Sequence, residues 1–287
     1  MRILLFLTFL LCGAVSAAEP MAYIFHHDES EMDVRNEYVW RVMRAALDRT
    51  IPTYGPYKMA PSMYMNEARR IFALEHDSGE ITLSMFPARA DLDGKLIPVR
   101  IPVDLGLLGY RVLLIREGEQ PRFDKVNSLT ELAGVTFGLG QGWDDVGVMQ
   151  NAGLKIVQGG TYEGLFRMLA AGRFDAFSRS ASEVVQEVEK RHALLPNLVI
   201  EKHLVLHYPL PAYFWFAKTE HGKRLADRLQ TGLNAMVDDG SLRAMFEQNF
   251  GPYLAQLDLA HRKVIELPNP FLGPYEPLND SRLWYHP

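Results

Sequence analysis

The amino-acid sequence predicts an α/β protein built from two similar lobes. Short apolar segments alternate with amphipathic helices along its 287 residues, which is the pattern of mixed α/β folds. A helix followed by a strand recurs at matching places in the two halves: residues 67–74 lead into 81–84, and residues 163–170 lead into 174–177. This repeat of one helix-strand unit indicates two lobes of related structure.

The first lobe is predicted to open with a strand at residues 22–25 and a long helix at residues 34–49. Apolar residues recur at helical spacing through the second segment, so one of its faces is expected to pack against a sheet. Asp33 stands where a side chain often caps a helix start. A shorter helix at residues 66–75 is expected to lead into a strand at residues 81–85.

The second lobe is predicted from residue 128 onward. Residues 128–134 indicate a short helix closed by glycine, residues 135–139 a strand, and residues 143–152 a further helix. The helix at residues 161–171 is expected to end at Gly172, because glycine readily adopts the left-handed conformation that follows a helix.

Two extended apolar segments, residues 110–115 and 211–216, are expected to carry the chain between the lobes. The final residues are rich in proline and aromatic side chains, so they cannot form a regular helix, and we expect them to pack along the outside of lobe one. The predicted division is a signal peptide at 1–18, lobe one at 19–113 with 212–260, lobe two at 114–211, and the tail at 261–287.

The N-terminal residues predict export from the cytoplasm. A basic start, the apolar run 3–11 and small residues at 13–18 form a cleavable secretory signal peptide, residues 1–18. The run is shorter than the roughly 20 apolar residues of a membrane-spanning helix. Cleavage also removes Cys12, the only cysteine, and Leu11 before it disfavours a lipoprotein signal. A mature protein that is soluble, works outside the cytoplasm and has no disulfides is therefore expected.

Two classes of ligand are disfavoured by the sequence: nucleic acids and nucleotides. The formal net charge of −5 contradicts the strong basic patch of a nucleic-acid-binding protein. A glycine-rich turn follows the strand at residues 135–139, but Gly138, Gly140 and Gly142 are spaced two apart, and Trp143 stands where a dinucleotide motif needs its third glycine. No cofactor is expected.

The order and spacing of several motifs carry a family resemblance. The segments Ser128-Leu-Thr-Glu-Leu-Ala-Gly-Val-Thr-Phe-Gly-Leu-Gly-Gln-Gly142, 162–177 and Met236-Val-Asp-Asp-Gly-Ser-Leu-Arg-Ala-Met-Phe-Glu-Gln-Asn-Phe-Gly251 resemble the bacterial extracellular solute-binding proteins of family 3, the amino-acid-type periplasmic binding proteins. The resemblance implies a type II periplasmic-binding-protein fold, in which two hinge strands join two lobes around an interlobe cleft. It also implies a monomer that delivers a small-molecule solute to an inner-membrane ABC permease.

Arg89 is the expected main anchor of the ligand. The resembled family places an arginine shortly after a lobe-one strand, where its guanidinium holds a carboxylate through two parallel hydrogen bonds. Arg89 stands at that position near the hydroxyl of Ser84, and a solvated surface arginine is the alternative. In lobe two the family binds the carboxylate at the helix start after Gly142, where this chain has Trp143 and Asp144. An acid there suits a helix N-terminus as a cap but competes with an anionic ligand.

Two further positions restrict the expected ligand. After residues 173–177 the family usually carries an aspartate that pairs with a ligand ammonium, whereas this chain has Ser178-Arg-Ser180, so an ordinary α-amino acid is disfavoured. His26 and His27 follow the first strand, where the family lines its cleft. Adjacent histidines point apart in an extended loop, so a hydrogen bond to a ligand or a solvated loop is favoured over a metal site.

Aromatic side chains complete the predicted site. Tyr23, Tyr64, Phe86 and Trp143 are candidates for the apolar walls of a small-molecule cleft, and residues of the core are the alternative. The candidate ligand-binding residues are Tyr23, His26, His27, Tyr64, Ser84, Phe86, Arg89, Trp143, Asp144 and Ser180.

The leading interpretation is a periplasmic substrate-binding protein, not an enzyme, that captures a small polar, anionic solute by closing its lobes. The first alternative is an enzyme on the same fold, such as a dehydratase of cyclohexadienyl acids, with His26, His27 and Asp144 as acid-base groups. The second alternative is a ligand-sensing module for a membrane receptor.

Overall fold

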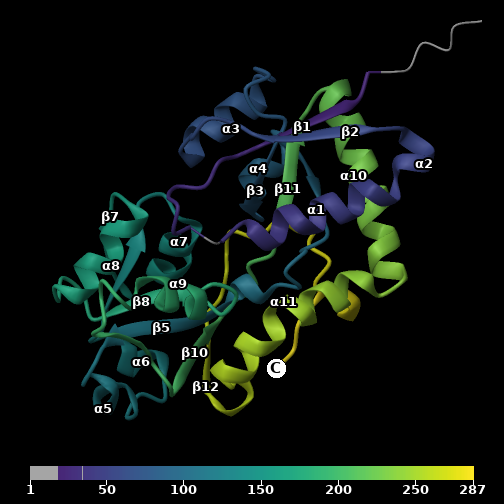
Figure 1. Ribbon diagram of the computed structural model, residues 1–287. Coiled ribbons are helices and arrows are strands. Elements are labelled where there is room, and N and C mark those ends of the chain that lie inside the picture. Colours follow the sequence, from purple (N-terminus) through teal and green to yellow (C-terminus); the bar gives the residue numbers. More distant parts are fainter. Residues whose placement is uncertain (1–18, 34) are drawn as a thin grey trace, which may run out of the picture.

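The computed structural model describes residues 19–33 and 35–287 (Figure 1). The predicted signal peptide and Val34 lie outside the described residues. The strands form three separate sheets of two, three and seven strands, and they divide the molecule into two lobes. None of the helices in the described ranges combines the length and apolar character that crossing a lipid bilayer requires.

The first lobe holds the two smaller sheets and lies in the upper part of Figure 1. Strands β1 and β2 pair in parallel, and β11 lies between β3 and β4, antiparallel to both. Two long helices, α1 and α10, pack against each other beside these sheets. Its elements are β1 (Met21–Phe25), α1 (Glu37–Arg49), α2 (Ile51–Tyr54), β2 (Tyr57–Pro61), α3 (Glu67–Glu75), β3 (Leu83–Pro87), α4 (Ala90–Asp93), β4 (Leu96–Val99), β11 (Ala212–Ala217) and α10 (Glu220–Asp238).

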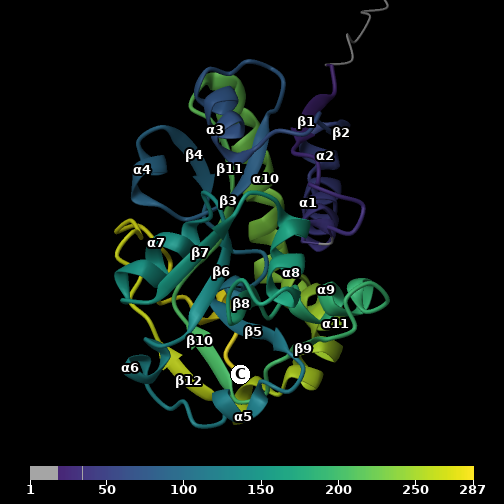
Figure 2. The same cartoon turned by 90° about the vertical axis from the view of Figure 1, so that its left-hand side faces the viewer.

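The second lobe is built on the large sheet, whose order is β12-β10-β5-β8-β6-β7 with β9 paired to β5. Figure 2 shows this sheet below the first lobe, with helices on both of its sides. Its elements are β5 (Tyr110–Arg116), α5 (Gln120–Phe123), α6 (Leu129–Leu132), β6 (Thr136–Gly140), α7 (Asp144–Asn151), β7 (Lys155–Gly159), α8 (Tyr162–Ala170), β8 (Ala176–Ser180), α9 (Val184–Arg191), β9 (Leu198–Ile200), β10 (Leu204–His207) and β12 (Lys263–Glu266). Helix α11 (Ser241–Leu257) carries the chain from α10 to β12.

Side-chain caps account for several helix starts. Asn66, Ser128, Thr161 and Thr219 each accept a hydrogen bond from the backbone N–H three residues later, at the starts of α3, α6, α8 and α10. Each bond satisfies a donor that the first helical turn leaves unpaired.

The start of α1 differs from the prediction. The helix begins at Glu37, and Asn36 at its N-cap makes no side-chain cap. Asp33, expected to cap it, instead accepts hydrogen bonds from the backbone of Glu29 and Arg35 and pairs with the Arg35 guanidinium. A buried carboxylate gains more from an arginine and two amides than from one helix amide, so Asp33 organises the loop before α1.

Helices α1 and α10 approach each other closely at one glycine. The apolar face of α1 is buried, as its helical spacing predicts. At the contact, a Cβ added to Gly232 of α10 would lie 2.1 Å from the carbonyl oxygen of Ala46 in α1. Only glycine allows this separation of the two backbones.

The segment 110–115, expected to cross between the lobes, lies wholly inside the second lobe. As β5 it pairs with β8, β9 and β10, and residues from Tyr110 to Ile115 are buried. A continuous apolar run is typical of a strand covered on both faces. The chain therefore enters the second lobe before Tyr110, and the predicted boundary at residue 113 would cut a central strand.

The tail departs from the prediction that it packs along lobe one. It begins with β12, which pairs in parallel with β10 and extends the large sheet. It then reaches the first lobe, where Ala90 N–H donates to the carbonyl of Phe271 at 3.0 Å and Tyr213 donates to Glu276 at 2.5 Å. Near its end, Tyr285 N–H donates to the carbonyl of Leu105 at 2.7 Å. The tail thus contacts both lobes.

Candidate functional site

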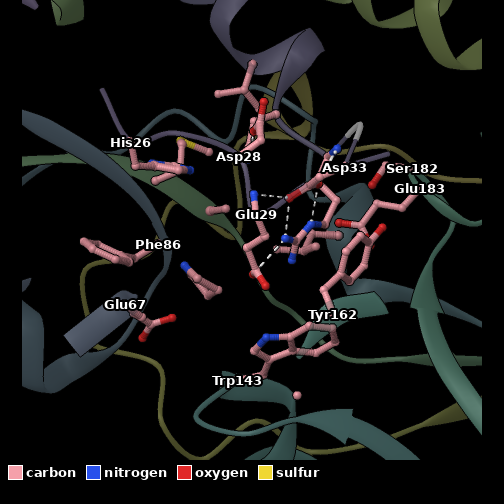
Figure 3. Close-up of a pocket in the computed structure, with 18 of the residues that line it drawn as sticks. His26, Asp28, Glu29, Asp33, Glu67, Phe86, Trp143, Tyr162, Ser182 and Glu183 are labelled. Atoms are coloured by element: carbon pink, nitrogen blue, oxygen red, sulfur yellow. Dashed lines mark hydrogen bonds and ion pairs between the residues drawn. The ribbon is translucent and has the colours of Figure 1, made fainter. Parts of the chain in front are cut away.

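A cavity with a volume of about 320 Å³ lies between the two lobes. This is at the lower end of the range of small-molecule sites. Figure 3 shows Phe86 of the first lobe on one side of it, and Trp143 with Tyr162 of the second lobe on the other. Loops that follow the strands of both lobes supply most of the lining.

The structure brings six of the ten predicted site residues to this cavity and leaves four outside its lining. Those that line it are His26, His27, Tyr64, Phe86, Trp143 and Asp144. Those that do not are Tyr23, Ser84, Arg89 and Ser180.

Three of the four excluded residues are buried in the protein. Tyr23 donates its hydroxyl to the carbonyl of Leu225 at 3.1 Å, and burial raises the pKa of this phenol. The Ser180 hydroxyl lies 2.7 Å from that of Ser182, and Ser84 lies behind the cavity wall. Tyr23, Ser84 and Ser180, which are predicted to contact a ligand, thus lie outside the lining of this cavity.

Arg89 binds carboxylates of the protein itself. Its NH1 donates to Asp144 Oδ1 at 2.8 Å and to Glu67 Oε1 at 2.9 Å, and its Nε donates to Asp91 at 3.1 Å. These acids take the donors that we expected a ligand to take. Because Arg89 precedes α4 and Asp144 opens α7, the first pair joins the two lobes across the cleft.

In this pair, the carboxyl of Asp144 has a raised pKa. Burial, followed by the negative charge of Glu67, raises the pKa of the Asp144 carboxyl to about 7, and the opposing effect of Arg89 is smaller. A carboxyl that titrates near neutral pH in a cleft is able to exchange a proton under physiological conditions.

Trp143 and the two acids after it form the start of α7 without capping it. Trp143 is the N-cap residue, and no side-chain cap is present. Its ring stacks on Phe177, with centroids 6.2 Å apart, and lies 5.1 Å from the Arg179 guanidinium. Asp145 pairs with Arg111 at 3.2 Å. The interpretation of Asp144 as a helix cap is wrong, because no side chain caps this helix and Arg89 of the first lobe binds the Asp144 carboxylate.

Three arginines in the interior of the cleft are neutralised by acids. Arg35 pairs with Asp33 at 2.6 Å and lies 4.2 Å from the ring of Tyr162 in the other lobe. Although burial raises the pKa of Asp33, the hydrogen bonds and charge of Arg35 outweigh it and lower the value to about 2. Arg179 of β8 likewise pairs with Glu187 at 2.5 Å, and Arg111 pairs with Asp145 as described above.

A group formed by Arg70, Ser84 and His26 lies on the first-lobe side. Arg70 NH1 donates to Ser84 Oγ at 2.9 Å, and this oxygen lies 3.0 Å from His26 Nδ1. Burial is the largest cause that holds the pKa of His26 well below its usual value, and the charge of Arg70 adds to it. His26 is therefore neutral, which favours a hydrogen-bonding role. His27 is exposed and contacts its own loop.

The sequence-based reasoning missed Arg70, Arg35, Tyr162 and Glu183, all of which line the cavity. No group of three or more His, Cys, Asp or Glu side chains in the described part of the chain is arranged to hold a metal ion. The residues that line the cavity present hydrogen-bonding, charged and aromatic groups.

Comparisons with solved structures identify the fold. An ancestral arginine-binding protein bound to arginine has a TM-score of 0.59 and 17% identity, over 81% of this chain and 99% of that one. The substrate binding protein of an amino acid ABC transporter has a TM-score of 0.55 and 12% identity, over 80% and 99%. An ancestral amino acid-binding protein, a precursor of cyclohexadienyl dehydratase, has a TM-score of 0.57 and 15% identity, over 80% and 95%.

No family model and no curated protein matches the chain. The structural neighbours share the two-lobed α/β fold over most of both chains. The type II periplasmic-binding-protein fold that the sequence predicts is thereby confirmed.

Proposed function

With the fold of the amino-acid-type periplasmic binding proteins as the premise, we propose that this protein captures a small polar solute between its two lobes. The observation that carries the proposal is the interlobe cavity, whose walls come from both lobes. A solute there contacts both walls only when the lobes are together, so binding and closure are coupled.

The proposed solute carries an anionic group, and the proposed partner is an inner-membrane ABC permease. One structural neighbour is the substrate binding protein of an amino acid ABC transporter, which supports this kind of partner. We further propose that residues 1–18 are a signal peptide, as the N-terminal sequence predicts, and that the mature protein works in the periplasm, as the family resemblance implies.

Catalysis on the same fold is the second candidate, and one observation favours it. The raised pKa of Asp144, about 7, is suited to general acid-base chemistry at neutral pH. A neighbour of this fold is a precursor of cyclohexadienyl dehydratase. The binding proposal is preferred because Arg89 holds Asp144 in an ion pair.

The experiment is a solute screen on the mature protein with two readouts. Amino acids, organic acids, polyamines and sugars are added singly, and a binder at 100 times its Kd is expected to raise the melting temperature by roughly 5 °C or more. Chromatography of the same mixtures detects product, and turnover of the bound solute would favour the enzyme.

Lobe closure is measured separately with two labels. Removal of the predicted signal peptide removes the only cysteine, Cys12, so labels attach only at engineered positions. Lys58→Cys on β2 and Lys155→Cys on β7 place one label on the exposed surface of each lobe. The bound solute is expected to narrow the distribution of label distances, and an unchanged distribution with every binder would overturn closure.

A further inference from the structure

We propose that Arg70 is the anchor for an oxyanion, a carboxylate or a phosphate group, on the solute that the interlobe cleft binds. This inference rests on the proposed function, because it names the chemical group that the same cleft selects. It assigns the anchoring role to a residue of α3 in place of Arg89.

Arg70 differs in its counter-charge from the other arginines that line the cavity, apart from Arg41, which is exposed and donates to the side chain of Asn249. Arg35, Arg111 and Arg179 each have a carboxylate oxygen within 3.2 Å. No such pair joins Arg70 to any acid in the described part of the chain, and Glu67 of the same helix is bound by Arg89 at 2.9 Å. A guanidinium withdrawn from water without a counter-charge is costly, so an anion that supplies one is bound favourably.

One edge of the Arg70 guanidinium is left unused by the described residues. NH1 donates to Ser84, which is the single hydrogen bond of this side chain within those residues. Nε is buried and has no acceptor among them. The N–H of Nε and one N–H of NH2 point the same way from the planar group, and this fork matches two oxygens of a carboxylate or phosphate.

Three neighbours hold the fork in place before a ligand arrives. The Arg70 guanidinium lies 5.0 Å from the centre of the Phe86 ring. Because Ser84 accepts from Arg70, its own hydroxyl proton is directed to His26 Nδ1, 3.0 Å away. A guanidinium fixed by a ring and a hydroxyl loses little conformational entropy when an anion binds.

The position of Arg70 also determines where the rest of the solute lies. Phe86 contacts the guanidinium on the first-lobe side, and Trp143 and Tyr162 face it across the cavity. A solute with its oxyanion on Arg70 therefore places its remaining atoms between these aromatic rings. The cavity selects a small anion with a flat or apolar body.

The test uses acetate, benzoate and inorganic phosphate as probes, with acetamide and benzamide as uncharged matches of the two carboxylates. Titration calorimetry and thermal melting of the mature protein are expected to detect at least one oxyanion and neither amide. Arg70→Met is expected to weaken that probe about 10- to 100-fold. Arg70→Lys is expected to recover only part of the loss, because an ammonium lacks the fork.

The melting temperature of the ligand-free variant separates binding from a structural role. Arg70→Met removes a partly buried charge that has no acid partner among the described residues, so the ligand-free protein is expected to melt at the wild-type temperature or above it. Arg69→Met is the matched control, because Arg69 neighbours it on α3, is 62% exposed and pairs with Glu80. This control is expected to leave probe affinity unchanged.

Binding of acetate or benzoate supports a carboxylate solute, and binding of phosphate alone supports a phosphorylated one. Equal probe affinity in wild type and Arg70→Met overturns the inference, and so does a lowered melting temperature with unchanged affinity. If the solute screen yields only neutral or cationic binders, the inference and the proposed anionic group both fall, while the capture of a small polar solute between the lobes stands. If no solute of any charge binds, the proposed function itself falls.

Discussion

Asp144 joins the two lobes through a carboxyl whose charge depends on pH. Its pKa of about 7 in the folded protein lies above the ordinary value of 3.8. Between these two pH values, the folded protein therefore keeps a proton on Asp144 that the unfolded chain has lost. Stability from this group is fully present below about pH 4 and is lost as the pH rises through about 7.

Asp144→Asn tests this linkage. The amide cannot titrate, so the fall in unfolding free energy between pH 5 and pH 8 is expected to be smaller in the variant, by roughly 1 to 3 kcal/mol. Denaturant titrations at several pH values measure it. Asp104, whose pKa burial raises to about 6, contributes with the same sign in both proteins. Asp91→Asn is the control, because Asp91 also pairs with Arg89 but is 61% exposed.

Trp143 is expected to shape ligand preference. Its ring lines the cavity and stacks on Phe177, so Trp143→Ser enlarges the cavity and removes packing at once. We expect a loss of roughly 1 to 3 kcal/mol in stability, because the ring is only partly buried. We also expect larger solutes to bind better relative to smaller ones. A solute panel and thermal melts measure both effects, and an unchanged order of affinities would show that the ring serves packing alone.

At the residue level, the sequence predicted several residues of the cleft. It did not predict which charged side chains of the cleft pair with each other. The position of Arg89 after a strand predicts a cleft-side arginine, and spacing cannot reveal that Asp144 binds it from the other lobe. The position of Arg70 near the cleft could have been predicted from the sequence. It lies three and four residues before Ala73 and Leu74, the two buried residues of α3, and thus shares their face. An arginine on the buried face of a helix is a candidate for function.

At the level of elements, the contact between α1 and α10 gives a prediction opposite to helix propensity. Alanine in place of Gly232 would favour the isolated helix, yet its Cβ would lie 2.1 Å from the Ala46 carbonyl. Gly232→Ala is therefore expected to cost roughly 1 to 3 kcal/mol as the helices move apart. Gly251→Ala in α11 is the matched control, since a Cβ there meets nothing within 4 Å. It is expected to change stability by less than about 1 kcal/mol, because the strain of a Cβ before Pro252 opposes the gain in helix propensity. Chemical denaturation compares the two.

The periodicity of apolar residues predicted the strands and helices, but it did not predict which strands pair with one another in the sheets. The apolar run of β5 predicts a buried strand, and the same run suits either a connection between lobes or the centre of a sheet. Pairing with β8, β9 and β10 places β5 at the centre of a sheet. Each of these partners lies far along the chain, so the local sequence cannot reveal the pairing. The four residues of β12 carry too little pattern to distinguish a strand from the irregular tail around them.

In the whole molecule, the tail supports the connection between the lobes. Leu105 and Gly106, between β4 and β5, both have positive φ, at 51° and 72°. Trp284 packs directly on Gly106, and Tyr285 N–H binds the Leu105 carbonyl. Left-handed backbone at a non-glycine residue persists only where its surroundings hold it. Trp284 and Tyr285 therefore restrain the segment on which the proposed closure of the lobes depends.

Trp284→Ala is expected to loosen this restraint. A bound solute should dissociate several-fold faster, and the label distances should broaden in the ligand-free protein, because the lobes separate more easily. Stopped-flow fluorescence measures the dissociation rate. Tyr275→Ala serves as the control, since this tail aromatic is 69% exposed. Equal rates in wild type and Trp284→Ala would assign the ring to packing without influence on lobe motion.

The contacts of residues 284 and 285 with the connection between the lobes also constrain the order in which the chain folds. The Tyr110 hydroxyl binds the Tyr285 carbonyl across 175 residues of sequence. Contacts between such distant residues form late, because a long loop must close first. A chain that emerges from a ribosome or a translocation channel with its N-terminus first can assemble its early helices at once. The connection between the lobes, however, stays incomplete until residues 284 and 285 have been released, so a chain truncated before Trp284 lacks these contacts.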